Sequence, residues 1–366
     1  PTKVSPTTGK ETYAFAKSDE AFKALQEHEN PEVQAIVAAR LGVRSTIEET
    51  RTQRFIDIAE RGTLPIPLRY YAAHTGRWGG GDKINMQNLP RGSQLKKAMR
   101  APRGYKFIDC DLSQIEARML AWLANEERLL TVFKNKGDVY CDFGSIVYNR
   151  PINKTDDADE RFVAKTAVLG LGYGLGTTRF HEMMNIGAMG PPIDMTYAEA
   201  QRIVTTYRST YANIPAFWKR CEDLIYAMCD NNRVGMKYGP LTVGPECLIM
   251  PNGLTLKYPG LRASGGRSYM GRKGSVKLYG GKLAENIVQA LSRIVITDAM
   301  IRTNKYLAPY GGRVVLTVHD ENVAVGPKEN ADVHMAEIKK LTLQQPDWCH
   351  GLPLESEEGF DIVYSK

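Results

Sequence analysis

The spacing of apolar residues divides the chain into a helical start, an extended stretch, a helical middle and a mixed end. Helix formers dominate three stretches near the start, residues 18–29, 30–42 and 45–62. Pro31 stands at a helix start, and Gly42 and Gly62 stand at two helix ends, where these residue types are favoured. Residues 63–105 carry more glycine, proline and asparagine with little periodicity, which predicts loops and extended chain.

A strand is predicted at residues 107–112. There Phe107, Asp109 and Asp111 alternate with Ile108, Cys110 and Leu112, so the two sets lie on opposite faces. Beyond this strand, the pattern predicts one long amphipathic helix over 113–133 and further helices through 232. Hairpins are predicted over the glycine-rich residues 233–282, followed by a helix over 284–307. Two apolar strands then follow, joined by the polar turn His-Asp-Glu-Asn at 319–322.

Composition is typical of a globular protein rather than a membrane or disulfide-rich one. Hydrophobic residues make up 43% of the 366 residues, and no run reaches the roughly 20 apolar residues that span a bilayer. The six cysteines form no Cys-x-x-Cys pair, which favours reduced thiols over zinc ligands or disulfides. A net charge of +7 favours a polyanionic partner without establishing one. The first residues lack the apolar core of a secretory signal, so we expect a cytoplasmic protein without a membrane partner.

Two acidic positions have the setting that a metal site requires. Asp111 ends the first strand just before a helix start, and Asp320 and Glu321 occupy the tip of the later hairpin. Carboxylates at strand ends suit hard divalent cations, and two of them together could clamp two Mg²⁺ ions for displacement at a phosphoryl group. Taken singly, a helix cap at Asp111 and solvated turn residues at 320–321 are the simpler explanations.

A cationic and aromatic stripe lies between these acidic positions. Arg161, Lys165, Leu169 and Tyr173 recur every four residues, which places them along one helix stripe about 18 Å long. Two cations on this stripe could hold the oxygens of a triphosphate, while the later positions meet sugar and base. In isolation, a solvated Arg and Lys on a core helix is the more ordinary explanation.

Six short motifs, taken in order, resemble those of family A (DNA polymerase I-like) DNA polymerases. Asp-Leu-Ser-Gln-Ile-Glu from 111, Arg-x3-Lys-x3-Leu-x3-Tyr-Gly from 161 and Val-His-Asp-Glu from 318 have the order of the family's motifs A, B and C. His-Thr-Gly-Arg-Trp from 74 with Asn-Met-Gln-Asn-Leu-Pro from 85, Glu-Asn-Ile-Val-Gln from 285, and Val-Arg-Ser-Thr from 43 are similar to three further family segments. The resemblance covers nearly the whole chain, and the segments from 285 and 346 have a phage-like character.

The resemblance implies an α+β right-hand polymerase fold with an antiparallel-sheet palm, helical fingers and a partial thumb. The lower thumb would comprise residues 1–62, the palm 63–118 and 284–366, and the fingers 119–283. It implies template-directed addition of dNTPs to a primer 3′-end, using two Mg²⁺ ions with Mn²⁺ as an alternative. Primer–template DNA and dNTPs would be the partners, together with an exonuclease domain upstream or a processivity factor outside this chain.

The same resemblance assigns roles to individual residues. Asp111 and Asp320 would hold the metals with the Leu112 carbonyl, and Glu321 would support them. The nucleotide would meet Gln114, Arg161, Lys165, Leu169, Tyr173 and His319, with Lys165 also a general acid toward pyrophosphate and Glu116 a steric gate against a ribose 2′-hydroxyl. The DNA would lie along Arg44, Ser45, Thr46, Arg77, Asn85, Gln87, Asn88, Gln289 and Arg293.

Several features depart from the family's pattern or leave alternatives. Leu169 stands where the family has Phe or Tyr, so we expect altered nucleotide affinity and incorporation rate. Asp109 is either an outer partner of the metals or, as we favour, a polar residue at a strand start. The basic stretch 267–282 is either a hairpin against the DNA backbone or a solvated loop. The short segment before Arg77 predicts a thumb with a weak grip on the duplex.

Two rival functions have to be separated from the polymerase. A single-subunit RNA polymerase has a similar palm, but Glu116 would obstruct a ribonucleotide. A catalytically inactive DNA-binding clamp would not need Asp111, Asp320, Arg161 and Lys165 together.

Overall fold

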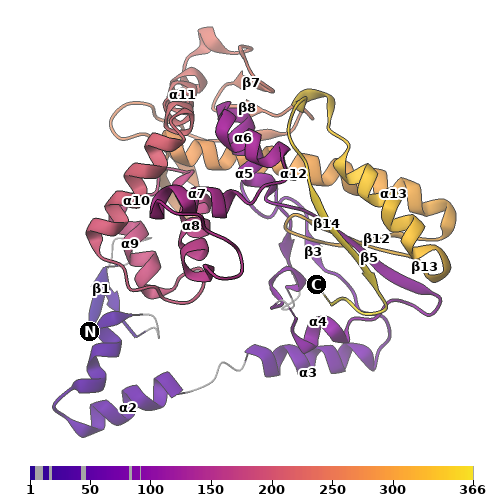
Figure 1. Cartoon of the computed structure of the whole chain (residues 1–366), viewed down its shortest axis with the longest axis horizontal. Coiled ribbons are helices and arrows are strands. Elements are labelled where there is room, and N and C mark those ends of the chain that lie inside the picture. Colours follow the sequence, from indigo (N-terminus) through magenta and orange to yellow (C-terminus); the bar gives the residue numbers. More distant parts are fainter. Residues whose placement is uncertain (5–10, 16–18, 43–46, 82–84, 91, 366) are drawn as a thin grey trace. The chain divides into compact units, whose positions relative to one another are not determined.

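The computed structural model describes residues 1–4, 11–15, 19–42, 47–81, 85–90 and 92–365 (Figure 1). They form two compact units, Pro1–Thr63 and Leu64–Lys366. The predicted DNA contacts Arg44, Ser45 and Thr46 lie outside the described residues.

The first unit is mostly helical, as predicted. It contains β1 (Thr2–Val4), β2 (Glu11–Tyr13), α1 (Glu20–Lys23), the 3-10 turn η1 (Ala24–Glu27), α2 (Pro31–Gly42) and α3 (Ile47–Ala59). The helix predicted from Pro31 to Gly42 has these bounds. The β1–β2 pair is an antiparallel hairpin that the sequence pattern did not predict.

A four-stranded antiparallel sheet organises the second unit. Its order is β12 (Arg313–Val318), β13 (Glu321–Pro327), β5 (Tyr105–Leu112) and β14 (Ser356–Asp361). β5 contains the strand predicted at 107–112. The turn between β12 and β13 is shorter than predicted, because Glu321 and Asn322 pair with Asp111 and Cys110 and only His319 and Asp320 join the strands.

The two faces of this sheet differ in polarity, as the alternation in β5 predicts. Ile108 and Cys110 pack with Leu307 and with Ile338 of α13 (Ala331–Leu343), the helix that runs beside the strands in Figure 1. The opposite face carries Asp109 and Asp111. A Cβ atom on Gly359, the β14 partner of Asp109, would lie only 3.3 Å from Asp109 Oδ1, so glycine leaves room for that buried carboxylate.

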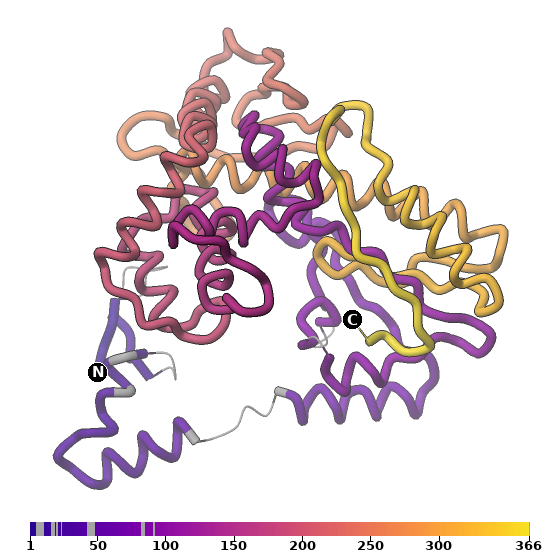
Figure 2. Tube along the Cα trace, viewed as in Figure 1, coloured from indigo at the N-terminus to yellow at the C-terminus, as the bar shows by residue number. Residues whose placement is uncertain are grey.

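Helices hold most of the apolar core of the second unit. They are α5 (Ile115–Ala124), α6 (Glu127–Lys134), α7 (Val139–Tyr148), α8 (Ala158–Leu171), α9 (Thr177–Ile186), α10 (Tyr197–Thr210), α11 (Asn213–Cys229) and α12 (Gly280–Leu307). Figure 2 shows the long course of α12 through this unit. The single helix predicted over 113–133 was wrong: Asn125 adopts a left-handed φ of 56° and closes α5, and α6 begins two residues later.

The stripe predicted from Arg161 to Tyr173 is also shorter than expected. α8 ends at Leu171, and Gly174 adopts a φ of +84°, so Tyr173 lies beyond the helix. Only Arg161, Lys165 and Leu169 therefore share one helix.

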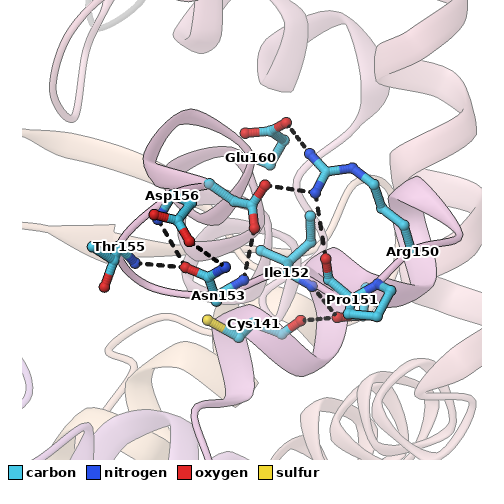
Figure 3. A network of polar contacts seen from close by, with 10 residues as sticks. Cys141, Arg150, Pro151, Ile152, Asn153, Thr155, Asp156 and Glu160 are labelled. Atoms are coloured by element: carbon cyan, nitrogen blue, oxygen red, sulfur yellow. Dashed lines mark hydrogen bonds and ion pairs between the residues drawn. The ribbon is translucent and has the colours of Figure 1, made fainter.

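A polar network fixes the loop that leads into α8 (Figure 3). Arg150 pairs with both Asp157 and Glu160, and Asn153 Oδ1 accepts a hydrogen bond from the backbone N–H of Asp156 at 2.8 Å. The first turn of the helix that carries Arg161 and Lys165 is thus tied to the chain before it.

Short elements complete the second unit. They are β3 (Leu68–Arg69), β4 (Gly79–Gly80), η2 (Met86–Asn88), α4 (Gln94–Ala98), η3 (Asn231–Arg233), β6 (Lys237–Tyr238), β7 (Leu241–Gly244), β8 (Cys247–Ile249), β9 (Thr255–Lys257), β10 (Ser268–Gly271), β11 (Gly274–Lys277), η4 (Ala308–Tyr310), η5 (Lys328–Asn330) and η6 (Asp347–Cys349). The hairpins predicted over 233–282 are confirmed by β6 to β11. Within the described part of the chain, no helix has the length and apolar character to cross a membrane.

Candidate active site

Asp111 and Asp320 lie at the same end of the sheet. Asp111 is the penultimate residue of β5, and Asp320 is in the turn that precedes β13, the strand paired with β5. The backbone N–H of Leu112 donates to the carbonyl oxygen of Asp320 at 3.0 Å, which ties the turn to the end of β5. Two acids far apart in sequence are therefore held side by side by backbone hydrogen bonds.

Electrostatic coupling between the two acids follows from this placement. Burial raises the pKa of Asp320 to about 6, the Arg77 guanidinium lowers it, and the Asp111 carboxylate raises it. Burial and Arg77 also lower the pKa of His319, which Asp111 opposes. Four side chains at this end of the sheet thus interact electrostatically: Arg77, Asp111, His319 and Asp320.

The chemistry of this group suits a divalent cation. Two carboxylates and the nearby Leu112 carbonyl offer the oxygen ligands that Mg²⁺ prefers. A cation would also stabilise the ionised carboxylate of Asp320, whose pKa is raised mainly by burial and further by the Asp111 carboxylate. Over the residues that the structure describes, no group of three or more His, Cys, Asp or Glu side chains is placed to hold a metal. Backbone, water or substrate oxygens could complete the coordination of a cation held by the two carboxylates.

A solvent-open hollow of about 430 Å³ lies beside Asp320. It brings together residues from four separate segments, Arg77, Trp78, Gln87, Gln289, Ser292, Arg293, Ile296, Thr297, Met300, Thr317, His319 and Asp320. Six of these twelve, Arg77, Gln87, Gln289, Arg293, His319 and Asp320, were predicted from the sequence to meet DNA, nucleotide or metal.

Arg293 is the buried cation of this hollow. It is 6% exposed, and its guanidinium lies 5.3 Å from the Tyr70 ring centroid. Its Nε and Nη2 atoms have no hydrogen-bond partner among the described residues. A buried guanidinium with donors to spare is costly unless an acceptor reaches it, so Arg293 is placed to bind one.

Arg77 forms an ion pair with Glu116 in the first turn of α5. This pair joins a residue predicted to meet DNA to the residue predicted as the steric gate. Gln114, directly before α5, has a left-handed φ of 53°. Its side chain forms a hydrogen bond with Tyr140. This bond lowers the pKa of the Tyr140 hydroxyl, but burial raises that pKa by more. The turn after β5 therefore directs two predicted nucleotide contacts to different neighbours.

The other predicted DNA contacts differ in how they are held. Gln87 is buried and donates through Nε2 to the Thr317 carbonyl at 3.1 Å, so it braces β12. Asn85 caps η2 by accepting from the Gln87 N–H at 3.0 Å, whereas Asn88 is exposed. Gln289 accepts from the Thr75 hydroxyl at 3.3 Å.

Asp138 holds Arg161, an interaction that the sequence pattern missed. Arg161 Nη2 lies 2.7 Å from Asp138 Oδ2, and its Nε donates to the same oxygen at 2.9 Å. Asp138 also caps α7 by accepting from the backbone N–H groups of Tyr140 and Cys141. The signal was present as an Asp before an apolar helical run, a common N-cap pattern.

Lys165, Leu169 and Tyr173 differ in exposure. Lys165 is exposed, and Leu169 and Tyr173 are half-buried. Burial raises the pKa of Tyr173, Asp320 raises it further, and Arg77 lowers it. Tyr173 is therefore within electrostatic reach of the acidic end of the sheet, although none of the described residues lining the hollow comes from α8.

Glu321 is buried rather than solvated. It is 5% exposed, and Tyr364 Oη donates to its Oε2 at 2.6 Å. No pattern around Tyr364 pointed to this contact, because it depends on where the segment after β14 returns to the sheet.

The chain is similar in sequence to known DNA polymerases. The sequence profile of DNA polymerase family A matches residues 2–230. The chain is 28% identical to the DNA polymerase of Bacillus phage SP02 over 89% of its own length, and 27% identical to the thermostable DNA polymerase I of Thermus aquaticus over 81%. It spans 57% of the first relative and 32% of the second.

A solved structure has the same fold. The whole chain is similar to 58% of the POL domain of Pol1 from M. smegmatis, a protein in complex with DNA primer-template and dNTP, with a TM-score of 0.71 and 19% identity. This likeness confirms the predicted α+β polymerase fold. Because the family profile matches more than half of the sequence, the chain belongs to DNA polymerase family A.

Proposed function

We propose that this chain is the catalytic part of a template-directed DNA polymerase, which adds dNTPs to a primer 3′-end. One observation carries the proposal: Asp111 and Asp320 lie side by side at one end of the sheet, where its two central strands β5 and β13 meet, next to a hollow lined by donors. The POL domain with a similar fold was solved with primer–template and dNTP, and the curated relatives are DNA polymerases, which supports the same partners here.

Asp111 and Asp320 would hold two Mg²⁺ ions, or Mn²⁺ in their place, with the Leu112 carbonyl. When bound, such ions acidify the primer 3′-hydroxyl and stabilise the charge of the leaving pyrophosphate. The residues of the chain supply position: the hydrogen bond from Leu112 to Asp320 fixes the separation of the two acids.

The nucleotide would be held by residues from α8 and from the turn before α5. Arg161 and Lys165 would bind the phosphates, and Lys165 is placed on an exposed helix position from which it could protonate pyrophosphate. Leu169 and Tyr173 would meet the sugar and base. Glu116, held by Arg77, would occupy the space of a 2′-hydroxyl, while Gln114 and His319 would make lesser contacts.

DNA would lie over the hollow. Two guanidinium donors of Arg293 have no partner within the part of the chain that the structure describes, and minor-groove acceptors occur on every base pair, so this contact would tolerate any sequence. Five further residues would serve the duplex: Arg77, Asn85, Gln87, Asn88 and Gln289. Asn85 and Gln87, which hold η2 and β12, would act by supporting the wall of the hollow rather than by touching DNA. Arg44, Ser45 and Thr46 are assigned to the DNA backbone by resemblance alone.

The assignment of residues 1–62 to the lower thumb, 63–118 and 284–366 to the palm and 119–283 to the fingers belongs to the same proposal. Two further predictions stay predictions. One is an exonuclease domain or a processivity factor outside this chain. The other is a location in the cytoplasm, which would be that of the host if the protein is viral.

Primer extension tests the function. The wild-type chain should extend a primer with dNTPs and Mg²⁺, and it should discriminate strongly against rNTPs. Asp320→Asn should lose at least about a thousandfold in kcat, since a metal ligand is removed. Asp332→Asn, at an exposed acid on α13, is the matched control and should keep full activity. Extension that prefers rNTPs would instead favour the RNA polymerase, and duplex binding without any extension would favour the inactive clamp.

A further inference from the structure

Tyr364 is fixed against the sheet face that carries the acids. It is 1% exposed, and its ring centroid lies 6.1 Å from that of Phe107 on β5. Its backbone N–H donates to the Met99 carbonyl at 3.1 Å, and the neighbouring Val363 forms an antiparallel bridge with Arg100. Main-chain contacts therefore determine where the Tyr364 hydroxyl points.

That hydroxyl reaches Glu321 at a position where acids crowd together. Glu321 on β13 and Glu357 on β14 are both register partners of Asp111 on β5. Directly opposed side chains in an antiparallel pair lie on the same face, and like charges there repel. Glu321 is also buried, so its carboxylate has lost the water that would stabilise its charge.

The hydrogen bond from Tyr364 to Glu321 offsets this cost. At 2.6 Å it has the length of a charge-assisted O–H···O⁻ bond. Lys96 adds a buried cation to the same place, with its ammonium 4.6 Å from the Tyr364 ring centroid. The Tyr364 hydroxyl thus stabilises the buried Glu321 carboxylate, and Lys96 packs against the ring that carries this hydroxyl.

Glu321 is joined by one peptide bond to Asp320, so its placement affects the metal ligand. The turn before it is strained, because His319 adopts a φ of 53° without being glycine. One end of this turn is tied to Leu112 by the Asp320 carbonyl, and Glu321 is tied to Tyr364 by its side chain. Backbone pairing of Glu321 with Asp111 and Val318 would keep the turn in place without the second tie, but the Glu321 side chain would no longer be fixed, and the adjoining Asp320 side chain would be less precisely oriented toward Asp111.

We propose that Tyr364 is a positioning residue for the metal site: its hydroxyl holds Glu321 so that Asp320 and Asp111 face one another. The inference rests on the proposed metal site at Asp111 and Asp320, and on the polymerase activity only for its second readout. Residues that orient metal ligands without touching the metal commonly change metal affinity by about 10- to 100-fold. A residue that merely filled the core would change thermal stability and leave metal affinity alone.

The test measures Mn²⁺ affinity by calorimetry on the chain without DNA, and the Mg²⁺ concentration for half-maximal primer extension. Tyr364→Phe should weaken Mn²⁺ binding about tenfold and raise the half-saturating Mg²⁺ similarly, with little change in KM for dNTP. Glu321→Gln should act in the same direction, and the double variant should be no worse than Glu321→Gln alone.

The matched control is Tyr306→Phe. It removes the hydroxyl of another tyrosine of this unit, one that bonds His334 Nδ1 at 3.0 Å between α12 and α13. It should leave Mn²⁺ affinity unchanged. Unchanged Mn²⁺ affinity in folded Tyr364→Phe would overturn the proposal, even if the melting temperature of the variant falls. If Tyr364→Phe does not fold, unchanged Mn²⁺ affinity in Glu321→Gln would overturn the proposal instead. A wild-type chain that binds Mn²⁺ through Asp111 and Asp320 without extending primers would refute the polymerase function and leave this inference standing.

Discussion

Removing the charge of Asp138 should free Arg161 for the nucleotide. Asp138 makes two kinds of contact. It accepts hydrogen bonds from two backbone N–H groups at the start of α7, and it forms an ion pair with Arg161 on α8. Asn is as good an N-cap as Asp, whereas Ala is not. Asp138→Asn therefore removes only the ion pair, and Asp138→Ala removes the pair and the cap.

The size of each effect follows from these contacts. A partly exposed ion pair such as this one stabilises by up to about 1 kcal/mol, and an N-cap by roughly 1 kcal/mol. Asp138→Asn should cost up to about 1 kcal/mol of unfolding free energy, and Asp138→Ala about 2. If Arg161 must leave Asp138 to bind phosphate, the Asn variant no longer has to break the pair, and dNTP should bind about fivefold tighter.

The pH dependence of stability has a definite sign. Burial raises the pKa of Asp138, but the Arg161 guanidinium and the backbone N–H groups outweigh it, and the pKa is lowered overall. The pair therefore stabilises the fold at neutral pH, and its contribution is lost as pH falls below about 4. The stability difference between wild type and Asp138→Asn should shrink over that range.

The assay is the dNTP concentration dependence of single-turnover incorporation, with thermal unfolding measured in parallel. Asp142→Asn is the control, because Asp142 lies in the first turn of α7 and pairs with Arg128 of α6. Nucleotide affinity that falls in Asp138→Asn would contradict the competition, and would mean that Asp138 orients Arg161 for the phosphates instead.

Three further predictions concern selection and stability. Glu116→Ala should raise rNTP incorporation relative to dNTP by at least about tenfold because it vacates the space of the 2′-hydroxyl, and unchanged discrimination in competitive extension would refute the gate. Leu169→Phe should lower KM for natural and dideoxy nucleotides by stacking on the incoming nucleotide, and identical kcat and KM for both would remove this role. Leu291→Ala should lower the unfolding free energy by about 3 kcal/mol in denaturant titration, because this α12 residue is fully buried in the largest core, and a loss below 1 kcal/mol would contradict that burial.

Local patterns predicted the elements well where the chain's own chemistry decides them. Period-two alternation identified β5 and the faces of Asp109 and Asp111, and terminus residues marked the bounds of α2. The break between α5 and α6 was missed because Asn125 closes the helix through its left-handed backbone, which apolar periodicity does not report.

The site shows the same division. Motif order identified the two acids and most of the polar wall of the hollow. The contacts from Asp138 to Arg161 and from Tyr364 to Glu321 were not predictable, because each joins segments that only the folded chain brings together. Glu321 was expected at the tip of the hairpin as a supporting acid, with a solvated turn residue as the simpler alternative, but strand register buries it opposite Asp111.

Asp111 and Asp320 should act together as one metal site. The most direct test is a crystal of the chain with primer–template and dNTP grown in Mn²⁺, with the metal located by its anomalous scattering. We expect two peaks roughly 3.5–4 Å apart, next to the carboxylates of both Asp111 and Asp320. Peaks that contact only one of the two acids, or that lie away from the end of β5, would contradict this expectation.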